Sequence, residues 1–354
     1  MIEKKIPFVG LHAHSVAGSI FDAIGYPDEH MDFCYENGGE ALALTDHGNM
    51  NGFSHQFLHW QKMKSEGKEF KPIFGVEAYF LPSIDEWRDD YERIKEDKKL
   101  AKSLAKQGDT SGATVEDEEA SKKAIKSVVN RRRHLVLLAQ NQTGLNNLFK
   151  LISASYREEN FYRYPRVDYK MLAEHSEGVI AASACLGGPY AGNYWEHREE
   201  GPEAVREAMR ETTRNFVEVF GDRWYGELQW NNIPEQHELN QYIIEVCKEF
   251  DVTLISTADS HYPNREAWKD RELYKRLGWL GKGTPAWAED NTELPPGVEE
   301  IGYELYPKNG NEIWESYKQY SKNLGMEYDD DLVMNSITET HNIAFNRIET
   351  FVPD

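Results

Sequence analysis

The chain has 354 residues, of which 40% are hydrophobic, and it carries a net charge of −21. This length and apolar content suffice for one large α/β domain or two ordinary ones. A surface this acidic repels nucleic acid except where basic residues or bound metal ions concentrate positive charge. No stretch approaches the roughly 18 apolar residues of a membrane span, and residues 1–7 lack the apolar segment of a signal peptide. Three widely spaced cysteines predict no disulfide framework, so we expect a cytoplasmic protein without membrane association.

Short apolar runs of β type alternate with helix-like stretches along most of the chain, which is typical of parallel βα units. The seven runs cover residues 8–12, 41–45, 73–80, 134–139, 179–182, 224–229 and 253–257. The helical candidates between them cover residues 27–37, 53–65, 144–155, 202–220 and 234–250. Seven strands predict a barrel or a doubly wound sheet. Both architectures place active sites at the carboxyl ends of the strands.

Residues that can bind metal ions or act as acids and bases lie at or near these strand ends. In chain order they are His12, His14, Asp46, His47, Glu77, His134, Cys185, Asp259 and His261. A lone histidine is more often a hydrogen-bonded core or surface residue, so the inference rests on the whole set. Imidazole, carboxylate and thiolate groups together suit zinc, manganese or iron, and shared carboxylates can bridge neighbouring ions.

The first two histidines have a definite geometry if their run is a strand. Side chains alternate between the two faces of a strand, so His12 and His14 project to the same side. Such a pair is a common start for a metal site. It is only suggestive without the other residues.

Six ordered motifs resemble the PHP (polymerase and histidinol phosphatase) domain. They are LHAHS at 11–15, TDHGN at 45–49, GVE at 75–77, HLVLLA at 134–139, SACLGG at 183–188 and DSHY at 259–262. Segments 161–188 and 302–317 are similar to connecting segments of the bacterial DNA polymerase III alpha type. The similarity extends from residue 7 to residue 350 or so and includes no polymerase domain. TatD-like and amidohydrolase barrels also use His-x-His, but the TDHGN segment and the final Asp-x-His favour the PHP family.

The resemblance implies a distorted (βα)7 TIM-like barrel, formed as a single domain by residues 1–354, with a trinuclear centre of divalent ions (Mn, Zn or Fe). It implies one ion held by His12, His14, Glu77 and Asp259, a second by Glu77, His134 and Cys185, and a third by Asp22, His47 and His261. The residues expected to carry catalysis are His12, His14, Glu77, Asp259 and His261. His261 or His47 is a candidate for proton transfer to the leaving group. We interpret Asp46 as a carboxylate that orients an imidazole rather than as a ligand.

Three segments depart from the family pattern or leave alternatives open. The charged insertion at 85–133, between strands three and four, ends in six basic residues and is either a DNA-guiding or docking arm or a solvated helical excursion. Residues 156–169 interleave arginines with aromatic rings and either bind single strands or pack as an ordinary loop. A C-terminal helix over 333–350 either caps the barrel or meets a partner.

The function that the resemblance implies is metal-dependent hydrolysis of phosphate esters. The polymerase-like branch favours a 3′–5′ exonuclease of the proofreading type, which acts on DNA with a 3′ end beside a separately encoded DNA polymerase. Two alternatives remain open. One is a phosphomonoesterase acting on a small phosphate ester or nucleotide. The other is a catalytically silent, metal-binding scaffold that docks a polymerase.

Overall fold

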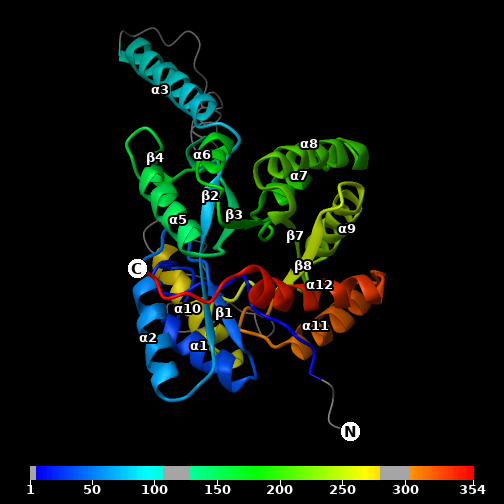
Figure 1. Cartoon of the computed structure of the whole chain (residues 1–354). Coiled ribbons are helices and arrows are strands. Elements are labelled where there is room, and N and C mark those ends of the chain that lie inside the picture. The colour runs from blue at the N-terminus through cyan, green and yellow to red at the C-terminus, as the bar shows by residue number, and fades with distance from the viewer. Residues whose placement is uncertain (1–4, 107–127, 280–302) are drawn as a thin grey trace.

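A mixed sheet of six strands forms the centre of the molecule (Figure 1). The computed structural model describes residues 5–106, 128–279 and 303–354. The strand order is β1 (Ala41–Leu44), β2 (Lys71–Phe80), β3 (Arg133–Ala139), β6 (Val179–Ala182), β7 (Trp224–Gln229) and β8 (Thr253–Thr257). Six of the seven expected runs are therefore strands of this sheet.

The remaining run, residues 8–12 near the N-terminus, closes the sheet without forming a regular strand. Gly10 bridges Leu42 at β1, and Ala13 bridges Ser260 just after β8, both in parallel. The segment thus lies between the first and last strands of the sheet. This arrangement confirms the predicted distorted barrel.

Strand β3 departs from the parallel arrangement that the alternating pattern predicted. It pairs in antiparallel fashion with both β2 and β6, whereas all other neighbours in the sheet are parallel. The chain leaves the carboxyl end of β2 and re-enters the sheet at the same end, because Phe80 pairs with Arg133. The first residues of β3, including His134, therefore lie at the carboxyl ends of the parallel strands.

Helices surround the sheet. They are α1 (Pro27–Glu36), α2 (Phe53–Ser65), α3 (Ile84–Lys106), α5 (Gln142–Ser155), α6 (Tyr169–Glu174), α7 (Pro189–His197), α8 (Pro202–Phe220), α9 (Pro234–Glu249), α10 (Trp268–Trp279), α11 (Gly310–Asn323) and α12 (Asp330–Asn342). Short elements are the 3₁₀ turns Gly221–Arg223 and Arg265–Ala267, the π-turn Ile343–Arg347 and a two-stranded hairpin of β4 (Phe161–Tyr162) and β5 (Tyr164–Pro165). Proline at the first turn of α8 and α9 suits a helix start, because its missing N–H has no partner there. Among the described residues, no helix combines the length and apolar character needed to cross a membrane.

The barrel is apolar at one end and polar at the other. A buried cluster that includes Ile73, Leu138 and Ile180 fills the interior toward the amino ends of the parallel strands. Along the same face of β2, Ile73 is followed four residues later by Glu77, since side chains alternate with period two. The change from apolar to polar lining therefore places charged groups at the carboxyl ends.

The C-terminal segment completes the apolar end. Ile343, Ala344 and Ile348, which follow α12, belong to the interior cluster. The Lys71 ammonium donates hydrogen bonds of 2.6 Å to the carbonyl oxygens of Ala344 and Ile348. The C-terminal segment, for which the sequence left both barrel capping and partner contact as alternatives, thus packs against the barrel.

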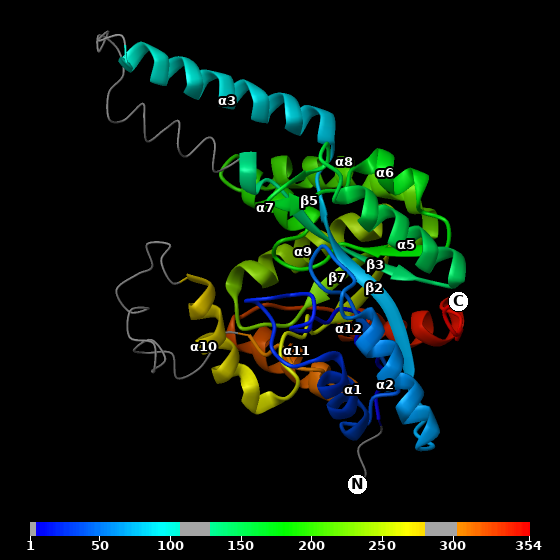
Figure 2. The ribbon, with the colours of Figure 1, turned by 90° about the vertical axis from the view of Figure 1, so that its left-hand side faces the viewer.

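The charged insertion begins with α3, which projects away from the body of the molecule (Figures 1 and 2). Its root is held by a small cluster of Leu81, Ile84, Trp87 and Val128. The insertion lies between β2 and β3, as the sequence predicted. Three of the six basic residues, at positions 122, 123 and 126, lie outside the described residues.

Candidate metal centre

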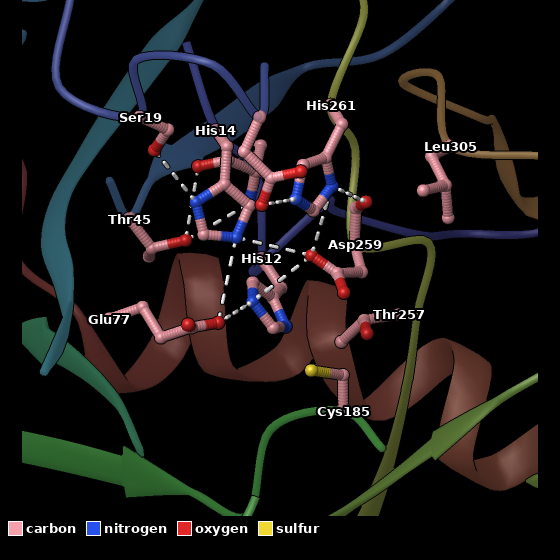
Figure 3. A network of polar contacts seen from close by, with 12 residues as sticks. His12, His14, Ser19, Thr45, Glu77, Cys185, Thr257, Asp259, His261 and Leu305 are labelled. Atoms are coloured by element: carbon pink, nitrogen blue, oxygen red, sulfur yellow. Dashed lines mark hydrogen bonds and ion pairs between the residues drawn. The ribbon is translucent and has the colours of Figure 1, made fainter. Parts of the chain in front are cut away.

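All nine predicted ligand residues converge at the carboxyl ends of the parallel strands. His12 and His14 come from the N-terminal segment and Asp22 from the loop after it. The others arrive from the strand ends: His47 after β1, Glu77 in β2, His134 in β3, Cys185 after β6, and Asp259 and His261 after β8. Figure 3 shows several of these side chains pointing toward one another. The cluster opens to solvent at Asp22 and His134, whose side chains are 39% and 23% exposed.

The first donor group consists of His12, His14, Glu77 and Asp259, all buried. The Nε2 atom of His12 lies 2.6 Å from Oε2 of Glu77 and 3.2 Å from Oδ1 of Asp259. The Nε2 atom of His14 lies 3.1 Å from the same Asp259 oxygen. His14 Nε2 and Asp259 Oδ1 are buried without hydrogen-bond partners among the described residues. Two nitrogens and two carboxylate oxygens within 4.8 Å of one another fit a divalent ion.

The second donor group uses the other oxygen of Glu77. Oε1 lies 2.7 Å from Nδ1 of His134 and 2.8 Å from Nδ1 of His47. The Cys185 sulfur lies 3.6 Å from His134 Nδ1, next to this group. Because Glu77 faces two groups with two different oxygens, it is placed to bridge two ions.

The third donor group is the most exposed. Oδ2 of Asp22 lies 2.9 Å from Nε2 of His47 and 3.4 Å from Nε2 of His261. The His14 ring lies between these imidazoles, with centroid distances of 4.1 Å to His47 and 4.4 Å to His261. His14 and His47 thus each stand between two donor groups, a sharing that the sequence did not indicate.

Unusual backbone conformations accompany three of the predicted ligands. Asp259 has a φ of 51°, and Phe21 and Ala184, which directly precede Asp22 and Cys185, have φ values of 64° and 58°. Residues other than glycine rarely adopt this left-handed region, which costs on the order of 1–3 kcal/mol each and is concentrated at functional sites. The turns at three strand or loop ends are therefore strained in a way that aims ligand side chains into the cluster.

The carboxylates and imidazoles of the cluster shift each other's pKa values strongly. Burial alone would lower the pKa of His12, but Asp259 and Glu227 outweigh it and hold that pKa well above its ordinary value. Burial alone would raise the pKa of Glu77, yet His134 and His47 hold it well below its ordinary value. The site therefore draws positive charge, either as protons or as metal cations.

The pKa values of Cys185 and His261 are also shifted, which affects how each can bind a metal ion. Burial, together with the carboxylates of Asp259 and Glu77, raises the pKa of the Cys185 thiol well above its ordinary value. Burial lowers the pKa of His261 to about 4. Its Nδ1 donates a 2.7 Å hydrogen bond to the backbone carbonyl of Asp259, so the neutral ring presents Nε2 as a lone pair toward Asp22.

Sequence reasoning missed two residues that position predicted ligands. Glu227, in β7, accepts a 2.7 Å hydrogen bond from Nδ1 of His12 and so turns Nε2 toward the first donor group. Arg271, in α10, donates to Oδ1 of Asp22 at 2.7 Å and to its carbonyl oxygen at 2.6 Å. The only signal for Glu227 was a carboxylate inside an otherwise uncharged run. Nothing in the sequence linked Arg271 to a residue 249 positions away.

The structure places Asp46 next to the centre rather than in it. Its carboxylate accepts hydrogen bonds from the backbone N–H and hydroxyl of Ser15 and from the hydroxyl of Ser19. The Ser19 oxygen in turn lies 3.3 Å from Nδ1 of His14. The orienting contact that we predicted for Asp46 therefore passes through a serine hydroxyl.

Comparison with known proteins identifies the family. The model of the PHP domain matches residues 10–231, which is more than half of the chain, so the chain belongs to the PHP family, as the motifs predicted. It is 37% identical over 259 residues to the DNA polymerase III subunit alpha of Aquifex aeolicus, covering 73% of this chain and 18% of that protein. It is 33% identical over 317 residues to the same subunit of Borreliella burgdorferi, covering 90% of this chain and 23% of that protein. The chain thus spans less than a quarter of the curated relatives' length.

Among solved structures, an amidohydrolase from Chromobacterium violaceum matches with a TM-score of 0.36 and 13% identity, over 75% of this chain and 96% of that one.

Proposed function

We propose that this protein is a metal-dependent phosphoesterase that removes nucleotides from the 3′ ends of DNA. The observation that carries the proposal is the convergence of nine ligand-type side chains into three connected donor groups, with Glu77 between two of them. A cluster of divalent ions can supply an activated water at neutral pH and stabilise negative charge on phosphate oxygens.

The protein's own residues have separate tasks in this chemistry. Glu227 fixes His12, and Arg271 fixes Asp22, so the first and third donor groups are held before substrate arrives. His261 is neutral near pH 7, with its lone pair toward Asp22, which favours a ligand role for it over proton donation. His47 therefore is the better of the two candidates for assisting the leaving group.

The choice of DNA as substrate rests on the relatives. Those reported above are DNA polymerase III alpha subunits, and the similarity extends beyond the metal motifs into connecting segments. An enzyme that trims 3′ ends is useful beside a polymerase, so we propose a separately encoded DNA polymerase as the partner. The identity of the ions, with manganese, zinc and iron as candidates, follows from the mixed nitrogen, oxygen and sulfur donor set.

The test is a degradation assay with a matched control. A 5′-labelled single strand and a mismatched primer–template are incubated with manganese, zinc or iron(II) and with the wild type, Asp259→Asn or Asp270→Asn. Asp270 is an exposed residue of α10 outside the donor groups. We expect shortening from the 3′ end by the wild type and Asp270→Asn, lost in Asp259→Asn. Intact DNA with every metal would refute the exonuclease. Phosphate release from a small ester would then favour a phosphomonoesterase, and complete inertness a docking scaffold.

A further inference from the structure

Three consecutive arginines precede or open β3, and their partners differ. Arg131 forms an ion pair of 2.8 Å with Asp90 of α3, and Arg133 pairs with Glu196 of α7. Arg132 has no carboxylate partner among the described residues, although the chain carries 61 acidic side chains. A partly buried cation without a counter-ion is unfavourable, which suggests that its counter-ion comes from a ligand.

The guanidinium of Arg132 lies over the ring of Tyr164 and beside that of Tyr79. Its central carbon lies 3.8 Å from the ring centroid of Tyr164 and 5.1 Å from that of Tyr79. One terminal nitrogen donates to the carbonyl of Asn130, while Nε is buried with no hydrogen-bond partner in the described part of the chain. Stacking fixes the plane of the guanidinium and leaves donors free, which suits recognition of a phosphate.

The Tyr79 ring separates Arg132 from two of the predicted metal ligands. The Tyr79 ring is stacked at 6.1 Å on His47 and lies 5.7 Å from the His134 ring. Tyr79 shares the inner face of β2 with Glu77 and is paired with His134 in the sheet register. Arg132, two residues before His134, projects to the same side. A phosphate bound by Arg132 would therefore be close to the phosphate being cleaved.

The hairpin β4–β5, which contributes Tyr164, carries two exposed rings, of which Tyr162 is the register partner of Tyr164. Phe161 and Tyr162 are 39% and 36% exposed, and the turn between the strands is Arg163, with a φ of 61°. Phe161 is stacked on Tyr156, itself 48% exposed, at 5.5 Å. The hairpin is tied to the end of β2 from which α3 departs, because Phe80 bridges Val167 just after β5.

A buried arginine makes the hairpin rigid. Arg166 is fully buried, its guanidinium lies 4.0 Å from the Trp87 ring, and it donates to the backbone carbonyls of Val129, Arg131, Tyr162 and Tyr164. For residues 156–169 the sequence left two alternatives, binding of single-stranded nucleic acid or packing as an ordinary loop. The segment divides into two parts. Arg166 serves packing, while Phe161, Tyr162 and Arg163 are exposed, with the Tyr162 ring 4.8 Å from that of Tyr91 on one side.

We propose that Arg132 and the β4–β5 hairpin form a subsite for single-stranded DNA, in which Arg132 pairs with the phosphate next to the scissile one and the exposed rings stack on the bases. The subsite deepens the proposed function and rests on it for the position of the scissile phosphate. Stacking on aromatic rings together with cationic contacts to the backbone is the usual means of binding single strands without sequence preference. On a surface with a net charge of −21, such a local cation is what allows a polyanion to approach.

The test separates binding from cleavage. In the Asp259→Asn background, which we expect to leave DNA intact, fluorescence anisotropy measures the affinity for a labelled single-stranded oligothymidine. We expect Arg132→Gln to weaken binding about tenfold or more, the scale for losing a hydrogen bond to a charged group. The slope of log K against log salt should fall by about 0.7. Arg132→Lys should be intermediate, because it keeps the charge and loses the stacked plane. Tyr162→Ala should weaken binding with an unchanged salt slope.

Arg131→Gln is the matched control, since Arg131 already has a carboxylate partner. Equal affinities for Arg132→Gln and Arg131→Gln, or absence of single-strand binding by the parent protein, would overturn the subsite. Thermal unfolding of each variant shows whether it is folded. The proposed function fails on a separate result: a metal-loaded wild type that binds single strands but leaves them intact.

Discussion

Replacing Glu227 tests whether the donor groups bind metal in the arrangement inferred here. Oε1 of Glu227 lies 2.7 Å from Nδ1 of His12, and both side chains are buried. Loss of such a supporting carboxylate usually weakens metal binding 10- to 100-fold, or roughly 1.4–2.7 kcal/mol. In Glu227→Gln the amide oxygen still accepts the hydrogen bond and keeps the ring orientation. Only the charge is lost, so we expect a loss near tenfold. Glu227→Ala removes both effects and should approach a hundredfold.

The assay is a calorimetric titration of metal-free protein with manganese. Glu218→Gln, at an exposed residue of α8 outside the donor groups, is the matched control for loss of a carboxylate. Urea unfolding of each variant establishes that it is folded. If Glu227→Gln and Glu227→Ala both bind manganese as tightly as Glu218→Gln, then His12 is not a ligand oriented by Glu227, and the reasoning about the first donor group is wrong.

Three further predictions follow from single contacts. Burial lowers the pKa of His30 from 6.5 to about 4, so the stability that the neutral ring contributes is full above pH 6.5 and is lost as pH falls toward 4. Between pH 7.5 and pH 5, the free energy of unfolding in urea should therefore fall by about 2 kcal/mol more in the wild type than in His30→Gln. Equal falls in the two proteins would refute this. In Gly144→Ala the added methyl would lie 1.8 Å from the carbonyl oxygen of Gly178, so the free energy of unfolding should fall by about 1–3 kcal/mol, whereas unchanged stability would contradict the close approach. Arg271→Gln frees Asp22, the most exposed of the predicted ligands, so metal analysis after dialysis should show fewer retained ions than in the wild type, and full retention would argue against that role.

The sequence predicted the strands well because each is a local apolar run. Six of seven runs became strands of the sheet, and the exception, residues 8–12, still lies between β1 and the end of β8. The direction of β3 could not be predicted, because alternation of apolar residues is the same in either direction. Direction depends on where the chain re-enters the sheet, and the inserted segment returns it to the end from which it left.

The sequence predicted which residues gather at the candidate site better than it predicted the contacts that orient them. Histidines and carboxylates at strand ends must meet once the strands form a barrel, so His47, Glu77 and Asp259 could be grouped from their positions. The contacts that orient them come from elsewhere: Arg271 lies in a helix, and Glu227 is one of many acidic residues in the chain. Local patterns do not encode such long-range contacts.

The polar end of the barrel bears on whether the protein merely docks a partner. The interior is filled by apolar side chains such as Ile73 and Leu138 a few residues below the cluster, so this fold accommodates an apolar interior. Replacing buried charged groups by apolar ones of similar volume is often neutral or stabilising. A scaffold that bound no metal would therefore be as well served by apolar residues at Glu77 and Asp259, without the left-handed backbone at Asp259. The cluster is costly to the fold, and that cost is explained by the cations and the phosphate that we propose it binds.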